Sequence, residues 1–336
     1  MTFKTTLYDN AGTTNAFHFY LGAKETTPIE IDFGYGKQEF VISEAVYDPT
    51  AGISGTLIEG SVGPRGTVSI YGDASLIDYV DIKGVYATTL DISQLTQLEI
   101  LRVDYNDIEA LDLSNHHKLQ VIYANSNPFN VSPLKIGPNK PDLTILELSM
   151  VENLDPSLNI SDYPNLAVFE AYATPTLTTC DPSQCPGLMK LTVDATNISS
   201  LDVSNNPELL ILNIGETKIT SIDLSNNPKL REFYCTHMGS MNQDYPMTSL
   251  DVSKNTQLQR LMCSGNQLTS IDVSNNPLLT SLFCNTNLLT SIDISKNPYI
   301  ESLNVSNNYL DFVTLPEPRN SFIEYYYYQR PLPIDR

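Results

Sequence analysis

The sequence predicts an all-β, irregular repeat solenoid, in which short turns of chain stack so that their strands form one parallel sheet. Two repeated phrases predict this fold. One is the four-residue phrase Leu-Asp-Val-Ser of Leu201–Ser204, copies of which most often follow one another after 21 residues. The other has the form L-x-x-L-x-φ-x-x-N, as in Leu279–Asn287, where φ is apolar. In addition, no segment shows the roughly 3.6-residue apolar periodicity of an amphipathic helix.

The second phrase supplies the predicted strands. In Leu101, Arg102 and Val103 apolar and polar residues alternate, as they do in a strand with one face toward the core. One such turn cannot bury its apolar face alone, so the turns must stack. The phrase predicts about twelve units, which start at Ile77, Leu98, Leu119, Leu143, Leu166, Leu188, Leu209, Leu230, Leu258, Leu279, Ile300 and, weakly, Ile323.

The Asn at the ninth position of the strand phrase predicts a ladder of amides that bond backbone groups where the chain leaves the strand. Several middle units lack it. Thr offers one hydrogen bond there, and Val and Met offer none, so we expect these turns to be built differently. They carry Val151, Thr174, Thr196, Thr217 and Met238. The Ser-Asn-Asn-Pro segments between strands predict extended or 3-10 turns on the opposite, convex side.

These phrases resemble those of a known family. Residues 268–277, Leu-Thr-Ser-Ile-Asp-Val-Ser-Asn-Asn-Pro, and 279–287, Leu-x-x-Leu-x-Cys-x-x-Asn, resemble the leucine-rich repeats of the 21-residue type common in Bacteroidetes surface proteins. The resemblance covers roughly residues 68–331. It implies a right-handed arc with a concave parallel sheet and a non-enzymatic binding or adhesion module. It also implies an extracellular or outer-membrane location, which no residue of this sequence indicates directly.

The two ends of the chain depart from the repeat. Residues 1–67 are predicted to form a β-structured cap, and residues 68–336 the solenoid, with a C-terminal cap and closing strand at 313–336. Clusters of Gly, Pro, Asp and Asn separate the predicted strands of the first block. These strands are Thr2–Tyr8, Ala16–Leu21, Pro28–Phe33, Lys37–Ile42 and Thr56–Glu59.

The charge balance excludes two classes of partner. With 19 basic and 39 acidic residues the formal net charge is −20, which argues against binding to nucleic acid or to anionic lipid. No apolar run reaches the roughly 18 residues of a membrane span, and no leader is visible at Met1. We expect no membrane insertion. The sequence leaves the oligomeric state open, and we favour a monomer.

The sequence predicts no catalytic residue, no metal site and no cofactor. It contains none of the common nucleophile, phosphate-loop or metal motifs, and its four His are scattered, with the His116–His117 pair expected in a solvated turn. Cys235, Cys263 and Cys284 occupy inward strand positions and are predicted to act as small core residues. A disulfide between Cys180 and Cys185 is left open.

The Asp of the four-residue phrase recurs along the convex side. We expect each carboxylate to accept hydrogen bonds from backbone N–H groups of the turn that follows, rather than to bind cations, because tight Gly-containing loops are absent. The residues are Asp91, Asp112, Asp181, Asp202, Asp223, Asp251, Asp272 and Asp293.

The outward strand positions carry the predicted ligand site. Aromatic side chains next to carboxylates suit recognition of a polypeptide, with a glycan as the alternative ligand. The longer units between residues 119 and 187, and an insertion around 238–247, favour loops near this surface. The predicted contact residues are Tyr123, Glu147, Glu170, Tyr172, Asp194, Tyr234 and Phe283.

Overall fold

The computed structural model shows a nearly all-β solenoid of about 10 turns. It describes residues 2–5, 16–48, 52–61, 67–237, 245–311 and 324–326. The chain divides into two compact units, Met1–Leu158 and Asn159–Arg336. Within the described residues the single helical element is a 3-10 turn, η1 (Ile160–Asp162). The predicted boundary at residue 67 stays a prediction.

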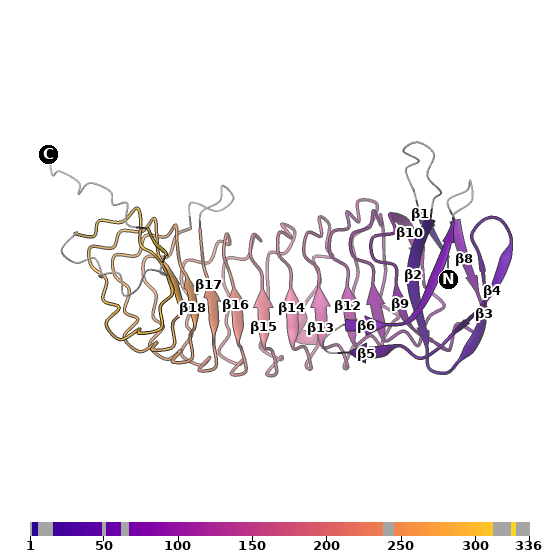
Figure 1. Cartoon of the computed structure of the whole chain (residues 1–336), viewed down its shortest axis with the longest axis horizontal. Helices are drawn as coiled ribbons and strands as arrows, with labels where there is room; N and C mark the ends of the chain where they lie inside the picture. The colour runs from indigo at the N-terminus through magenta and orange to yellow at the C-terminus, as the bar shows by residue number, and fades with distance from the viewer. Residues whose placement is uncertain are drawn as a thin grey trace. The chain divides into compact units, whose positions relative to one another are not determined.

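The first unit combines an N-terminal β block with the first turns of the solenoid (Figure 1). One sheet has the strand order β10-β1-β8-β3-β4, and β5 pairs with β6. A second sheet runs β7-β2-β9-β11-β12-β13, antiparallel from β7 to β9 and parallel thereafter. The strands are β1 (Thr2–Thr5), β2 (Ala16–Ala23), β3 (Thr27–Asp32), β4 (Lys37–Ile42), β5 (Val46–Asp48), β6 (Gly52–Ser54), β7 (Thr56–Ser61), β8 (Thr67–Tyr71), β9 (Ile77–Asp81), β10 (Ala87–Asp91), β11 (Ile100–Arg102), β12 (Val121–Tyr123) and β13 (Ile145–Glu147).

The five strands predicted before residue 60 correspond to β1, β2, β3, β4 and β7. The block was expected to continue into the solenoid and cover its first turn, but the sequence did not indicate which strand makes that contact. Strand β2 pairs antiparallel with β9, so that Tyr20 lies opposite Asp81 and Leu21 opposite Val80. Strand β2 therefore covers the free edge of the first repeat strand, which is the role expected of a cap.

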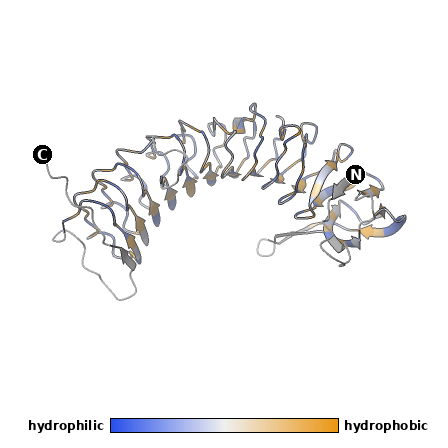
Figure 2. Cartoon of the chain, turned by 90° about the horizontal axis from the view of Figure 1, so that it is seen from above, coloured by the Kyte–Doolittle hydropathy of each residue, from blue (hydrophilic) through white to orange (hydrophobic). Residues whose placement is uncertain are grey.

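The second unit is a regular run of parallel strands in register (Figures 1 and 2). The strands are β14 (Val168–Glu170), β15 (Lys190–Thr192), β16 (Ile211–Asn213), β17 (Glu232–Tyr234), β18 (Arg260–Met262), β19 (Ser281–Phe283), β20 (Ser302–Asn304) and β21 (Glu324–Tyr326). Strand β21 pairs parallel with β20, while Ile323 and most of the predicted cap at 313–336 lie outside the described residues.

The core is a stack of inward side chains. The central residue of each strand from β11 to β20, such as Leu212 between Leu191 and Phe233, is fully buried. Burying one such side chain stabilises the fold by about 1.5–3 kcal/mol. Cys235, Cys263 and Cys284 are also fully buried, as predicted, and all five cysteines are free thiols, so Cys180 and Cys185 form no disulfide.

The amide ladder at the ninth position is confirmed. Asn287 Nδ2 lies 3.0 Å from Cys263 O of the preceding turn and 3.0 Å from Cys284 O of its own turn. Its Oδ1 accepts from Leu268 N at 3.0 Å. Where Thr replaces Asn, the hydroxyl bonds a carbonyl of its own turn: Thr196 Oγ1 donates to Val193 O at 2.6 Å. The turns with Thr174, Thr196 and Thr217 are therefore built differently, as this residue type predicted, and Met238 lies outside the described residues.

Candidate functional site

We call the outward side chains of the parallel strands the strand face. In the first unit this face carries the Arg102 guanidinium, which stacks on the ring of Tyr123. The register places Arg102 between Asp81 and Tyr123. The Arg102 guanidinium carbon lies 4.5 Å from the centre of the Tyr123 ring, and its nitrogens lie 3.8 Å from Asp81 Oδ2 and 3.5 Å from Asp104 Oδ2. These contacts fix Tyr123, a predicted contact residue that is half-buried.

A polar network continues from this cation toward Glu147. Asp104 is 3% exposed and accepts bonds from Asn125 N at 3.0 Å and from Asn125 Nδ2 at 2.8 Å. The same amide donates to Glu147 Oε2 at 3.1 Å. Burial raises the pKa of the Asp104 carboxyl, and the bonds from Asn125 oppose that shift. Register and hydrogen bonding therefore bring Tyr123 and Glu147 together.

The second unit holds the other predicted residues. Glu170 pairs with Lys190 Nζ at 2.5 Å, and the Tyr234 hydroxyl donates to Glu232, whose other oxygen lies 4.0 Å from Arg260. Tyr172 is 42% exposed, whereas Tyr234 and Phe283 are half-buried. Most predicted contact residues are thus held by neighbours on adjacent turns.

Asp194 is the most constrained of the predicted residues. Its Oδ2 lies 3.4 Å from Asn213 Nδ2, and its buried Oδ1 has no hydrogen-bond partner. A Cβ added at Gly215 would come within 3.0 Å of that Oδ1, so the glycine makes room for the carboxylate. Burial raises the pKa of Asp194 to about 6, and the charge of Glu216 adds to the effect.

His237 was not predicted as part of any site, yet it acts electrostatically on the Asp194 carboxyl. It is 5% exposed, with Nδ1 3.1 Å from Cys235 O and Nε2 3.0 Å from Thr217 O. It bonds the Cys235 carbonyl. In a regular turn the carbonyl at this position accepts a hydrogen bond from the Asn at the ninth position of the strand phrase, as Cys284 O does from Asn287. The sequence signal was the missing Asn at Met238, one residue further on.

The Asp row of the convex side has the predicted structural role. In all eight copies the carboxylate accepts from the backbone N–H of the Ser two residues on, at 2.8–3.0 Å. The backbone and side-chain hydrogen bonds from these serines lower the pKa of six of the carboxyls, those of Asp91, Asp112, Asp202, Asp223, Asp251 and Asp272.

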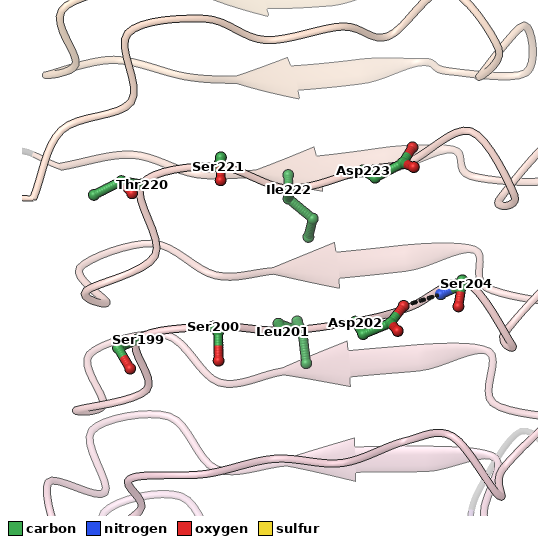
Figure 3. A pocket seen from close by; sticks show the side chains of 9 residues that line it. All are labelled: Ser199, Ser200, Leu201, Asp202, Ser204, Thr220, Ser221, Ile222 and Asp223. Atoms are coloured by element: carbon green, nitrogen blue, oxygen red, sulfur yellow. Dashed lines mark hydrogen bonds between the residues drawn. The ribbon is translucent and has the colours of Figure 1, made fainter.

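A polar depression of about 650 Å³ lies between two copies of this phrase (Figure 3). Its lining is a double row of hydroxyls with two of the structural carboxylates and contains none of the predicted contact residues. The lining residues are Ser199, Ser200, Leu201, Asp202, Ser204, Thr220, Ser221, Ile222 and Asp223.

A second internal ladder runs along the convex side, and sequence reasoning missed it. The second Asn of Ser-Asn-Asn-Pro is fully buried and bonds carbonyls of the preceding turn: Asn276 Nδ2 reaches Val252 O at 3.0 Å and Asn255 O at 2.9 Å. At the same position His116 is 2% exposed and its Nε2 lies 3.0 Å from Ile92 O. The expectation that both residues of the His116–His117 pair are solvated was therefore wrong for His116.

In the described part of the chain no group of three or more His, Cys, Asp or Glu has the arrangement of a metal site. The same residues include no helix with the length and apolarity of a membrane span.

Comparisons with known proteins place the fold. The structure is similar to that of an internalin, inlF, from Listeria monocytogenes, with 22% identity, coverage of 70% of this chain and 75% of that one, and a TM-score of 0.52. A weaker likeness is to the functional domain of InlJ from the same organism, with 22% identity, coverage of 73% of this chain and 72% of that one, and a TM-score of 0.42. Another is to a leucine-rich repeat protein of Leptospira interrogans, with 18% identity, coverage of 66% of this chain and 70% of that one, and a TM-score of 0.45. No family profile and no curated protein sequence matches. The fold is that of leucine-rich repeat solenoids.

Proposed function

We propose that this chain is a non-enzymatic, adhesion-type module on a bacterial cell surface that binds protein through its strand face. The proposal rests on the contacts that hold the side chains of the strand face in place. Aromatic and charged side chains of this face are held by neighbours on adjacent turns, as in the Arg102–Tyr123 stack and the Glu170–Lys190 pair. A surface fixed before binding loses less side-chain entropy on association. The fold likeness to an internalin supports the same class of protein.

A triple substitution of Tyr123, Glu147 and Tyr172 tests the proposal. The purified chain is applied to an array of extracellular protein domains and, separately, to a glycan array. We expect binding to protein features that the variant Tyr123→Ala, Glu147→Gln, Tyr172→Ala loses at least tenfold, while its melting temperature stays close to that of the wild type.

A matched control changes the same residue types elsewhere. Tyr35, Glu208 and Tyr299 are exposed and lie outside the parallel strands, so Tyr35→Ala, Glu208→Gln, Tyr299→Ala should bind normally. Undiminished protein binding by the strand-face variant, or binding to glycans alone, would refute the proposal.

A further inference from the structure

The eighth residue of the strand phrase, which we call the exit residue, has left-handed backbone in every turn of the first unit. Its N–H donates to a carbonyl of the next turn, as Tyr105 N does to Asn125 O at 2.9 Å and Ser126 N to Ser149 O at 2.8 Å. The exit residues therefore form one row beside the strand face. They are Gly84, Tyr105, Ser126 and Met150, with φ values of 67°, 57°, 56° and 57°.

Tyr105 and Met150 combine this backbone conformation with a large, exposed side chain. Left-handed backbone suits Gly best and Asn next, and a bulky residue there is strained. Gly265 and Asn307 fill the same position in the second unit. The side chains of Tyr105 and Met150 are 55% and 49% exposed, so burial within the chain does not offset the strain. Strained backbone of this kind clusters at binding sites, and Tyr and Met are enriched at protein interfaces.

The row of exit residues borders the polar network of the strand face, because Tyr105 directly follows the buried Asp104. Met150 lies two turns further along the row, roughly 10 Å away at the usual spacing of parallel strands. Ser126 stands between them, and its Oγ donates to Met150 Sδ at 3.8 Å. The two large side chains are therefore close enough to contact one partner surface together.

A cation lies at one end of this row. Lys83 is exposed, and its Nζ lies 5.2 Å from the centre of the Tyr105 ring. Its charge acts on the buried Asp104 carboxyl, but none of the ion pairs of the described residues includes Lys83. The ammonium is therefore available to a carboxylate of another molecule.

We propose that Lys83, Tyr105, Ser126 and Met150, the exit patch, form a second part of the binding surface and hold an apolar side chain of the partner protein that has a carboxylate beside it. The apolar side chain covers Tyr105 and Met150, and the carboxylate pairs with the Lys83 ammonium. Binding removes apolar surface from water, which stabilises the complex but not the free chain. The inference rests on the proposed function, because it adds residues and a partner chemistry to the same interface.

The double variant Tyr105→Asn, Met150→Asn tests the apolar part of the patch. The probe is the extracellular domain that binds the wild type most tightly on the protein array. We expect its affinity for the variant to fall about tenfold or more. The melting temperature should equal or exceed that of the wild type, because Asn relieves the strained backbone. Unchanged affinity would overturn the inference. So would lost affinity with a lower melting temperature, which would assign both residues to the fold.

Two controls separate the side chains from the backbone. Tyr299→Asn, Met189→Asn removes exposed side chains of the same types in the second unit, where neither residue has positive φ. Thr286→Asn changes an exit residue of the second unit with φ of 57°. Both variants should bind the probe like the wild type, and an equal loss of affinity in either would contradict the inference.

Failure of this inference can be told apart from failure of the proposed function. A wild-type chain that binds no domain on the array refutes both. Lost binding by the strand-face variant with Tyr123→Ala, Glu147→Gln and Tyr172→Ala, together with normal binding by the exit-patch variant, refutes only the exit patch.

The substitution Lys83→Gln tests the carboxylate of the partner. Its affinity for the same probe should fall about two- to fivefold. It should also depend less on salt concentration than the wild-type affinity, because salt screens an exposed ion pair. Lys254→Gln, which removes an exposed lysine of the second unit, should keep the wild-type affinity and salt dependence. Equal salt dependence of Lys83→Gln and the wild type would overturn the assignment of a carboxylate to the partner.

Discussion

Lys140 is a lysine in a position that Asn fills in other turns. It is fully buried, and its Nζ donates to Leu113 O at 3.0 Å and to Gly137 O at 3.5 Å. The equivalent Asn276 makes the same kind of contact to the preceding turn with a neutral amide. Burial lowers the pKa of Lys140 to about 8, against which Asp112 acts in the opposite direction.

Lys140→Asn should therefore stabilise the protein at neutral pH. A pKa lowered from 10.5 to about 8 corresponds to roughly 3 kcal/mol of disfavoured charge. The folded chain holds this proton less tightly than the unfolded chain, so wild-type stability increases as the pH rises from 8 toward 10. We expect the variant to gain about 1–3 kcal/mol at pH 7 and less at pH 10, as measured by urea unfolding.

A control for this variant is Lys118→Asn, which removes an exposed lysine of the same region and should change stability little. A loss of stability in Lys140→Asn at pH 7 would show that the lysine packs better than the amide of the other turns.

At the residue scale, the sequence predicted hydrogen-bond roles better than burial. Each Asp of the four-residue phrase was assigned its turn bond correctly, because an Asp two residues before a Ser makes that bond locally. Lys140, His116 and His237 were missed because their burial depends on where an irregular segment turns inward. Strand alternation carries no information about such segments.

At the scale of the element, the four-residue phrase is the most regular part of the second unit. Each copy exposes its Asp on the same side, so the carboxylates of successive turns repel one another. The charges of Asp202 and Asp251 raise the pKa of Asp223, while the bonds from Ser225 lower it more. The local turn bond therefore outweighs the repulsion along the row.

Replacing four of these carboxylates by amides tests that balance. In Asp202→Asn, Asp223→Asn, Asp251→Asn, Asp272→Asn the side-chain oxygen that accepts from Ser is kept and the charge is lost. Because the folded pKa values lie below 3.8, the wild type is stabilised above pH 3.8 and loses that contribution as the pH falls. The urea midpoint should fall less between pH 5 and pH 3 in the variant. Parallel curves would contradict this account.

The strand elements were predictable for a physical reason. A period of two fixes which side chains point inward, and the repeat length fixes which residues pair across turns. Arg102 beside Tyr123 follows from those two facts alone. The buried position of Asp194 Oδ1 does not, because it requires the missing Cβ of Gly215 on the next turn. The antiparallel β2–β9 pairing could not be predicted from the sequence either, since no repeated spacing connects these strands.

At the scale of the whole molecule, stability is built from contacts between neighbouring turns. The strand pairs of each unit join a turn to the one before and the one after it, as β16 joins β15 and β17. Solenoids of this kind behave approximately as a sum of local terms and nearest-neighbour interfaces. A substitution that destabilises one turn should therefore lower the stability of the neighbouring turns and leave distant turns unchanged.

The substitution Leu212→Ala tests how far destabilisation extends along the solenoid. Leu212 is fully buried in β16, and truncating such a side chain costs about 2–5 kcal/mol. Hydrogen–deuterium exchange should accelerate in β15, β16 and β17 and stay at the wild-type rate in β9, β11 and β12. The matched variant Leu101→Ala, equally buried in β11, should give the reverse pattern. Faster exchange throughout the chain in both variants would show that all turns unfold together, because a fully cooperative solenoid would transmit the loss of one interface to every other.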